Sequence, residues 1–238
     1  MKLSVIIPAY NAARHIDAVL ERVAELVTCG LDEVIVVDDG SRDDTARRVN
    51  ARQPAAFQVR LLQRPRNGGY GAAMKDGLKA ARTSNPDVVA CIHADGQYAP
   101  EALPAMLEQL SQRRLDLLQG SRIAAGTALR GGMPVYKYVG NALLNLIENR
   151  TLGLSLTDYH SGYLVYGPRA LGLPFGNLSD SFDFDLEVIA AARAHGFSVG
   201  EAPIPTHYGD ETSHLNPVTY GMRVLRVMWN YRRGRYAP

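Results

Sequence analysis

The chain has 238 residues, of which 46% are hydrophobic and 21% charged, and its formal net charge is +2. This length and composition fit one compact globular domain and exclude an intrinsically disordered or collagen-like chain. No run of about 18 apolar residues occurs, which excludes a membrane-spanning helix. The N-terminus lacks the apolar run of a signal peptide, and two cysteines are too few for a disulfide framework, so we expect a cytoplasmic setting.

The first 120 residues alternate between two hydrophobic patterns. Short β-branched runs predict buried parallel strands at residues 3–7, 33–37, 59–62, 88–92 and 115–119. Between them, apolar residues three and four positions apart predict helices at 16–27 and 72–82, and Pro100 opens another. Alternating strands and helices predict an open, mostly parallel α/β sheet flanked by helices.

The second half of the chain is less regular. Its hydrophobic patterns predict helices at 138–152 and 185–195 and strands at 163–166 and 197–199. The polar, proline-punctuated segment 203–214 is typical of an active-site flap. No linker separates two folding units, so we expect a single domain over 1–215, followed by a C-terminal segment, 216–238.

The C-terminal segment predicts a basic amphipathic helix at 218–233. One face carries Val218, Met222, Leu225 and Trp229, and the other carries Arg223, Arg226, Asn230 and Arg233. The segment holds five arginines and no acid, whereas the rest of the chain carries 21 basic and 24 acidic residues. Such a helix can lie on an anionic membrane surface, or it can pack on the domain with its arginines in water. No aromatic-interleaved basic surface appears elsewhere, so nucleic acid is not expected as a partner.

Polar side chains follow three of the predicted strands, at the point where each strand ends. They lie in residues 9–11, 38–41 and 93–97. Ligands of open α/β sheets bind beyond the carboxyl ends of the strands, so these groups should line one edge. The glycine-rich turn of dinucleotide-binding domains and the P-loop are both absent. Phosphate binding would then rely on a divalent metal or on scattered donors.

Two of these groups carry carboxylates. Asp38 and Asp39 could accept hydrogen bonds from a nucleobase or from ribose hydroxyls, whereas Asp43 and Asp44 fit a turn and a helix cap. In an extended segment, residues 93, 95 and 97 project to one side. His93, Asp95 and Gln97 could therefore converge on one Mg²⁺ or Mn²⁺ ion, the alternative being a polar turn that Asp95 caps.

Five ordered motifs carry a resemblance to a known family. Residues 5–11, 36–41 and 94–97 resemble the successive signatures of family-2 glycosyltransferases with the GT-A fold, a Rossmann-like open sheet. Gly120-Ser121-Arg122 and the segment 158–163 narrow the resemblance to polyprenyl-phosphate sugar transferases of the dolichyl-phosphate mannose synthase type. The resemblance covers about residues 3 to 210. The chain departs from the family at His93, where aspartate is usual, and at Tyr70, where lysine or leucine is common.

The resemblance implies roles for individual residues. The nucleotide sugar would be bound by Pro8, Tyr10, Asn11, Asp38, Asp39, Gly71, Ala94 and Asp95. Asp95 and Gln97 would ligate Mg²⁺ or Mn²⁺, with His93 and His207 as further candidate ligands. Arg122, Lys137 and Ser161 would contact the acceptor phosphate, and Asp158 would be the catalytic aspartate near the reaction centre.

The resemblance implies an inverting, metal-dependent transfer of a hexose from a nucleotide-diphosphate sugar of the GDP-mannose or UDP-glucose type. Its acceptor would be a polyprenyl phosphate at the inner face of the membrane. Residues 1–120 would bind the donor and 121–215 the acceptor. One alternative is a hydroxyl acceptor, with Asp158 as general base. A second alternative is a nucleotidyltransferase, but the glycine-rich turn expected of that class is missing from this sequence. A third is a non-catalytic nucleotide-sugar-binding protein.

Overall fold

The computed structural model describes the chain except residues 53, 55, 125, 127–134 and 206–216, and except the side chains at 137, 217 and 218. The described residues contain one seven-stranded sheet. In spatial order its strands are β3 (Gln58–Gln63), β2 (Leu31–Asp38), β1 (Leu3–Ala9), β4 (Val88–Cys91), β6 (Leu164–Tyr166), β5 (Leu117–Ser121) and β7 (Val199–Pro203).

Strand directions make this a mostly parallel sheet. The neighbours β3, β2, β1 and β4 are all parallel, as are β5 and β7, whereas β6 is antiparallel to both β4 and β5. The chain builds the sheet outward in one direction through β2 and β3 and then returns to the other side of β1 with β4. This reversal between β1 and β4 leaves a crevice at their carboxyl ends. The predicted GT-A-like architecture is confirmed.

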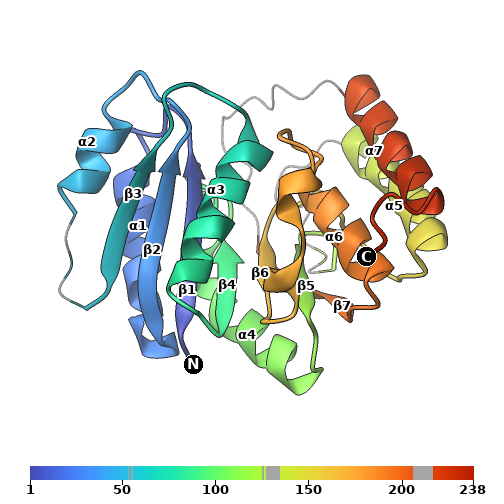
Figure 1. Ribbon diagram of the computed structural model, residues 1–238, viewed down its shortest axis with the longest axis horizontal. Helices are drawn as coiled ribbons and strands as arrows, with labels where there is room; N and C mark the ends of the chain where they lie inside the picture. The colour runs from blue at the N-terminus through green and yellow to red at the C-terminus, as the bar shows by residue number, and fades with distance from the viewer. Residues whose placement is uncertain (53, 55, 125, 127–134, 206–216) are drawn as a thin grey trace.

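Helices cover both faces of the sheet (Figure 1). One face packs against α1 (Ile16–Ala24), α2 (Thr45–Asn50) and α4 (Leu103–Gln112). The other packs against α3 (Tyr70–Thr83) and α6 (Phe184–Ala194). The residues of strands β1 and β2 alternate between the two cores, Ile6 and Ile35 on one side and Val5 and Val34 on the other, because successive side chains of a strand point to opposite faces.

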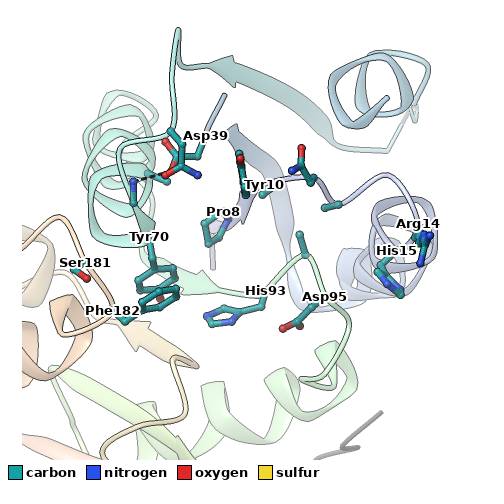
Figure 2. Close-up of a pocket in the computed structure, with 17 residues that line it drawn as sticks. Pro8, Tyr10, Arg14, His15, Asp39, Tyr70, His93, Asp95, Ser181 and Phe182 are labelled. Atoms are coloured by element: carbon teal, nitrogen blue, oxygen red, sulfur yellow. Dashed lines mark hydrogen bonds between the residues drawn. The ribbon is translucent and has the colours of Figure 1, made fainter. Parts of the chain in front are cut away.

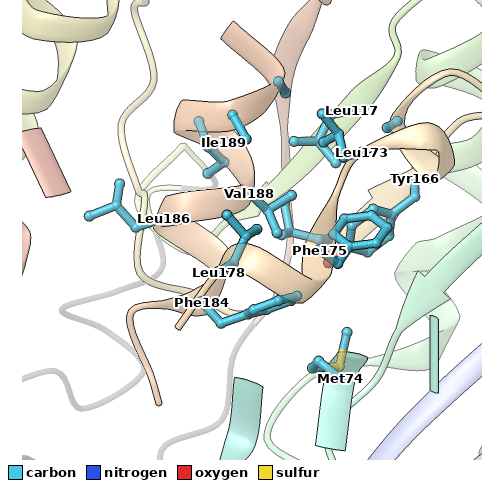
Figure 3. Close-up of a cluster of buried hydrophobic side chains, with 14 of the residues drawn as sticks. Met74, Leu117, Tyr166, Leu173, Phe175, Leu178, Phe184, Leu186, Val188 and Ile189 are labelled. Atoms are coloured by element: carbon cyan, nitrogen blue, oxygen red, sulfur yellow. The ribbon is translucent and has the colours of Figure 1, made fainter. Parts of the chain in front are cut away.

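The remaining helices, α5 (Val135–Leu152) and α7 (Pro217–Arg232), lie side by side at one end of the molecule (Figure 1). The core beneath α6 is drawn in Figure 3, where Val188 and Ile189 of the helix approach Leu117 of β5, and Phe175 lies against Tyr166. Helix α7 packs on both α5 and α6.

Element boundaries differ modestly from the sequence prediction. The helix expected over 16–27 ends at Ala24 and continues as a 3₁₀ turn, Glu25–Cys29, and Pro100 opens a 3₁₀ turn, Pro100–Ala102, before α4. Strand β7 begins at Val199, later than expected, and includes Pro203, which an edge strand tolerates because its free side needs no N–H. Both cysteines are free. Among the residues that the structure describes, no helix has the length and apolar character needed to cross a bilayer.

Candidate active site

A pocket of about 830 Å³ opens at the carboxyl ends of β1, β2 and β4 (Figure 2). It is lined by Pro8, Ala9, Tyr10, Asn11, Ala12, Arg14, His15, Asp39, Asn67, Gly69, Tyr70, Ala73, His93, Ala94, Asp95, Ser181 and Phe182. Six of the eight residues predicted to bind the nucleotide sugar are among them. Asp38 and Gly71 lie behind the surface, and Gln97, Arg122, Asp158 and Ser161 also lie outside the lining.

Backbone groups hold the two aspartates at the end of β2. Asp38 Oδ1 accepts a hydrogen bond from the Ser41 N–H at 2.9 Å, which closes the turn after the strand. Each carboxylate oxygen of Asp39 accepts one backbone N–H, from Gly68 and from Gly69, both at 2.9 Å. Asp39 is buried and also pairs with the Arg64 guanidinium. Its carboxylate is thus fixed in place as an acceptor at the pocket wall.

The loop after β1 is fastened to the loop after β2. The Asn11 N–H donates to Ser41 Oγ at 2.9 Å, and Asn11 Oδ1 accepts from the Arg42 N–H at 2.9 Å. Asn11 has a φ of +51°, a conformation that asparagine tolerates better than most residues. Tyr10 remains 48% exposed at the pocket rim. The two loops therefore form one rigid wall with an exposed aromatic ring.

Gly71 shapes the pocket without lining it. It lies in the first turn of α3, and a Cβ there would come within 2.3 Å of the Ser179 carbonyl oxygen. Its lack of a side chain lets the segment before α6 approach, which brings Phe182 over Tyr70 with nearly parallel rings 6.1 Å apart. Phe182 and Ser181 were not foreseen as pocket residues, because no pattern in the sequence links them to residues 69–73.

Asp95 and His93 follow the end of β4, and both line the pocket. Asp95 Oδ1 accepts the Gln97 N–H at 2.9 Å. The His93 ring lies 5.3 Å from that of Tyr70 and 5.0 Å from that of Tyr98, and Figure 2 shows it beside Asp95. Burial lowers the pKa of His93, although the Asp95 carboxylate raises it, so the ring is neutral at pH 7.

The carboxylate of Asp95 fits a divalent cation that substrate phosphates would help to hold. Within the described part of the chain, no three His, Cys, Asp or Glu side chains gather closely enough to hold a metal. Mg²⁺ commonly needs only one or two carboxylates together with substrate phosphates. Asp95 meets that requirement at the pocket wall. The further candidate His207 lies outside the described residues.

Arg122 and Asp158 form a buried ion pair beyond the pocket. The guanidinium Nε lies 2.7 Å from Asp158 Oδ2 and its second nitrogen lies 2.9 Å from Oδ1, a two-pronged arrangement. The Asp158 carboxylate is fully buried and also accepts the His160 N–H at 3.0 Å. Burial would raise the pKa of Asp158, but the Arg122 guanidinium holds it below its usual range.

Ser161 is part of the packing rather than of a surface. Its hydroxyl is buried, donates to the Gly120 carbonyl at 2.5 Å and accepts from the Gln119 side chain at 2.5 Å. The next residue, Gly162, has a φ of +71°, and a Cβ there would meet the His93 ring at 2.7 Å. This short segment therefore fixes His93 and the end of β5 together. The side chain of Lys137 lies outside the described residues.

Two buried acids near the site were not foreseen. Asp185, in the first turn of α6, accepts a hydrogen bond from the Tyr70 hydroxyl at 2.8 Å, and burial raises its pKa to about 7. Glu148 of α5 is fully buried, with His160 Nε2 3.4 Å from its carboxylate. An acid in the first turn of a helix ordinarily suggests only a favourable interaction with the helix dipole, so the sequence held no signal for Asp185.

Comparisons with known proteins agree with this geometry. The family model described as glycosyl transferase family 2 matches residues 4–172. The chain is 30% identical to the UDP-N-acetylglucosamine–dolichyl-phosphate N-acetylglucosaminyltransferase of Methanococcus voltae, over 85% of this chain and 84% of the relative. It is 31% identical to the undecaprenyl-phosphate mannosyltransferase of Micrococcus luteus, over 86% and 83%.

A solved structure shares the fold. It is glucosyl-3-phosphoglycerate synthase from Mycobacterium tuberculosis in complex with Mn²⁺, UDP and phosphoglyceric acid. The TM-score is 0.71 at 20% sequence identity, and the match covers 97% of this chain and 78% of that one.

Proposed function

The chain belongs to glycosyltransferase family 2, and on that premise we propose that it transfers a hexose from a nucleotide-diphosphate sugar to a polyprenyl phosphate. The observation that carries the proposal is the pocket at the sheet reversal, where Asp39 and Asp95 reach one cavity from separate strand ends. The names of the two relatives, both transferases to polyprenyl-type phosphates, support the acceptor class. The family shows that the enzyme is a glycosyltransferase. The identities of its donor and its acceptor are what we propose.

We assign the donor to residues 1–120. The nucleoside would lie against Pro8, Tyr10 and Asn11, with Asp39 accepting hydrogen bonds from its base or ribose, and Asp38 and Gly71 would support that wall from behind. Ala94 would border the diphosphate. Asp95 would hold Mg²⁺ or Mn²⁺ on the diphosphate oxygens, and the cation, when bound, would neutralise charge on the leaving group. GDP-mannose and UDP-glucose are the donor types proposed.

We assign the acceptor to residues 121–215, at Arg122. A guanidinium matches the geometry of phosphate oxygens, and the pair with Asp158 holds this one in a fixed orientation. Lys137 remains a proposed contact of the acceptor phosphate, whereas Ser161, whose buried hydroxyl bonds Gly120 and Gln119, would support the end of β5 behind the site. An acceptor of this class resides in a bilayer, so the enzyme would work as a peripheral protein at the inner membrane face, with residues 216–238 at the surface.

The ionisation of Asp158 supports a phosphate acceptor over a hydroxyl. A hydroxyl must lose its proton during transfer, and a general base works best with a pKa near the working pH. The pKa of Asp158 is held low by Arg122, which makes it a poor base. A phosphate is already ionised, so one of its oxygens can attack the anomeric carbon as the diphosphate leaves on the opposite side, inverting the configuration. Asp158 would then act by orienting Arg122.

The test compares two acceptors that differ only in the phosphate. The protein is incubated with a radiolabelled nucleotide sugar, Mg²⁺ or Mn²⁺, and either a short-chain polyprenyl phosphate soluble in detergent or the matching polyprenol. We expect label in lipid with the phosphate alone. Label on the free alcohol would favour the hydroxyl-acceptor alternative, and release of free sugar without labelled lipid would reject the acceptor class.

A further inference from the structure

We infer that α5 and α7 together form a docking face for a bilayer containing anionic lipids. The residues of this α5–α7 face are Val135, Tyr136, Val139, Leu143 and Leu146 of α5 and Met222, Leu225 and Trp229 of α7. All are large apolar side chains that are between 49% and 68% exposed. The inference deepens the proposed function, on which it rests, by stating how the enzyme meets a membrane-bound acceptor.

Helix α5 exposes a row of apolar residues on its outer face and buries both apolar and polar residues on its inner face, where Leu152 is in the core and Leu144 and Ile147 pack against it. Tyr136, Val139, Leu143 and Leu146 follow one another at spacings of three, four and three residues, so they form one exposed stripe. On the opposite side, Glu148 is fully buried and Asn145 is nearly so. A helix whose outer face met only water would carry the reverse pattern. The outer face of α5 is therefore built for contact with an apolar medium.

Helix α7 packs on the protein through a different face from the one that its sequence pattern favoured. Its buried residues are Val224, Val227 and Met228, and this leaves the predicted apolar residues Met222, Leu225 and Trp229 exposed on the outer side. The guanidinium of Arg233 lies 5.9 Å from the centre of the Trp229 ring. Tryptophan and tyrosine with nearby basic groups are typical of the membrane–water interface.

The charges of the two helices favour an anionic membrane as the surface that the α5–α7 face binds. Their only acidic residue is Glu148, which is buried, whereas Arg150, Arg226 and Arg232 are exposed, as is Arg223, which pairs with Asp183. An apolar strip bordered by arginines and free of exposed acid complements a bilayer whose headgroups are negative. A protein partner of mixed charge would leave several of these arginines without counter-charges.

The inner sides of the same helices hold the acceptor end of the site. The Tyr220 hydroxyl of α7 lies 3.0 Å from His160 Nδ1, and the Asn145 side chain donates to the Thr157 carbonyl. These contacts fasten the segment around Asp158 to the back of the docking face. One helix, about 10–12 Å across, would thus separate the bilayer from Arg122 and Asp158. A lipid phosphate could reach the site while its hydrocarbon chain stays in the membrane.

The chain carries its own reporter for the test, because Trp229 is its only tryptophan. The protein is titrated with vesicles of phosphatidylcholine alone and of phosphatidylcholine with phosphatidylglycerol, and binding is followed by flotation and by Trp229 emission. We expect a blue shift and flotation with the anionic vesicles, both weakening at high salt. Leu143→Gln with Leu146→Gln should weaken vesicle binding by about tenfold or more, since each leucine gives up apolar burial.

Val27→Gln is the matched control, because Val27 is 38% exposed but lies in the 3₁₀ turn after α1, on the N-terminal half. It should bind vesicles as the parent does. Equal binding by the Leu143/Leu146 variant, or no shift of Trp229 emission with either vesicle, would overturn the inference. The inference would also be overturned if the parent protein bound no vesicles and formed a dimer that this variant converts to a monomer. The α5–α7 face would then contact a second copy of the chain.

Activity separates this inference from the proposed function. The Leu143/Leu146 variant should keep the parent rate with a short-chain polyprenyl phosphate in detergent and lose rate only with a long-chain acceptor in vesicles. Failure of the parent on both acceptors rejects the proposed function. Equal rates of parent and variant on the vesicle-bound acceptor reject the docking face alone.

Discussion

The donor half and the acceptor half hold their charged groups by different means. At the donor pocket, Asp38, Asp39 and Asp95 each accept backbone N–H groups from turns beside the strand ends, and Asp39 pairs in addition with Arg64. At the acceptor end, Asp158 and Glu148 are fully buried and meet side chains, Arg122 and His160, from other elements. Replacing the partner side chain leaves a buried charge unpaired, whereas a backbone N–H in a turn remains after most side-chain substitutions.

The difference indicates which substitutions act on folding and which act on turnover. Changes at the acceptor pair should cost stability first, because a buried ion left alone is expensive. Changes to donor-side carboxylates should leave the fold intact and appear in the rate. Changes on the outer side of α5 and α7 should affect neither folding nor the turnover of a detergent-soluble acceptor, since these side chains already face solvent.

The largest stability effect is expected at the buried pair. Arg122→Met should lower the free energy of unfolding by about 3–5 kcal/mol at pH 7, since it leaves the Asp158 carboxylate buried without its partner. Urea denaturation of parent and variant measures the difference. Arg169→Met is the control, because Arg169 pairs with Asp116 while its own side chain is 63% exposed, and it should cost about 1 kcal/mol or less.

The same pair predicts a pH dependence. In the parent, the pKa of Asp158 lies below its unfolded value, so the pair stabilises the fold above about pH 3.9, and this contribution is lost as the pH falls through the folded pKa. Without Arg122, burial should raise the pKa of Asp158. The deficit of Arg122→Met should then be full at neutral pH and narrow toward pH 4, as the buried carboxyl takes up a proton. A deficit that stays constant with pH would contradict this account.

Next in size is the effect of Asp95→Asn on turnover. We expect kcat to fall by about 100-fold to 1,000-fold, because the diphosphate would lose the charge that positions its counter-ion. The melting temperature should change little, since an amide oxygen can still accept the Gln97 N–H. Asp32→Asn, an exposed carboxylate in β2 that pairs with Lys2, is the control and should keep the parent rate. Parent-like turnover of Asp95→Asn would contradict the proposed role.

A smaller effect is expected where the two halves meet, at Gly162. Gly162→Ala should lower the free energy of unfolding by about 1–3 kcal/mol, because its φ of +71° disfavours a side chain and the new Cβ would press on the His93 ring. The same substitution at Gly172 has no atom within 4 Å to meet and should be close to neutral. Equal melting temperatures for the two variants would show that the His93 ring yields without cost.

The smallest effect is expected on the docking face. Leu143→Gln with Leu146→Gln should change the free energy of unfolding by no more than about 0.5 kcal/mol, because both side chains are already exposed. Chemical denaturation without lipid measures it. A loss of several kcal/mol would mean that the outer side of α5 is covered by protein in solution, which contradicts a free docking face.

Several parts of the site follow from local patterns. The ends of β1, β2 and β4 were placed at one edge because parallel strands of one sheet end together, and Asp39 and Asp95 do line one pocket there. The shared metal site of His93, Asp95 and Gln97 stays a prediction. The sequence held no signal for the aromatic surroundings of His93, whose ring lies near those of Tyr70 and Tyr98 and against Gly162.

The sheet, its flanking helices and the polar strand ends could be predicted without the structure, because they depend on periodicity and on turns a few residues long. Three arrangements became visible only in the folded chain: Arg122 is bound to Asp158, Phe182 lies over Tyr70, and α5 buries Glu148 while it exposes Leu143 and Leu146. These arrangements join side chains from separate elements, and their energies depend on burial and distance. Neither quantity is fixed until the chain has packed.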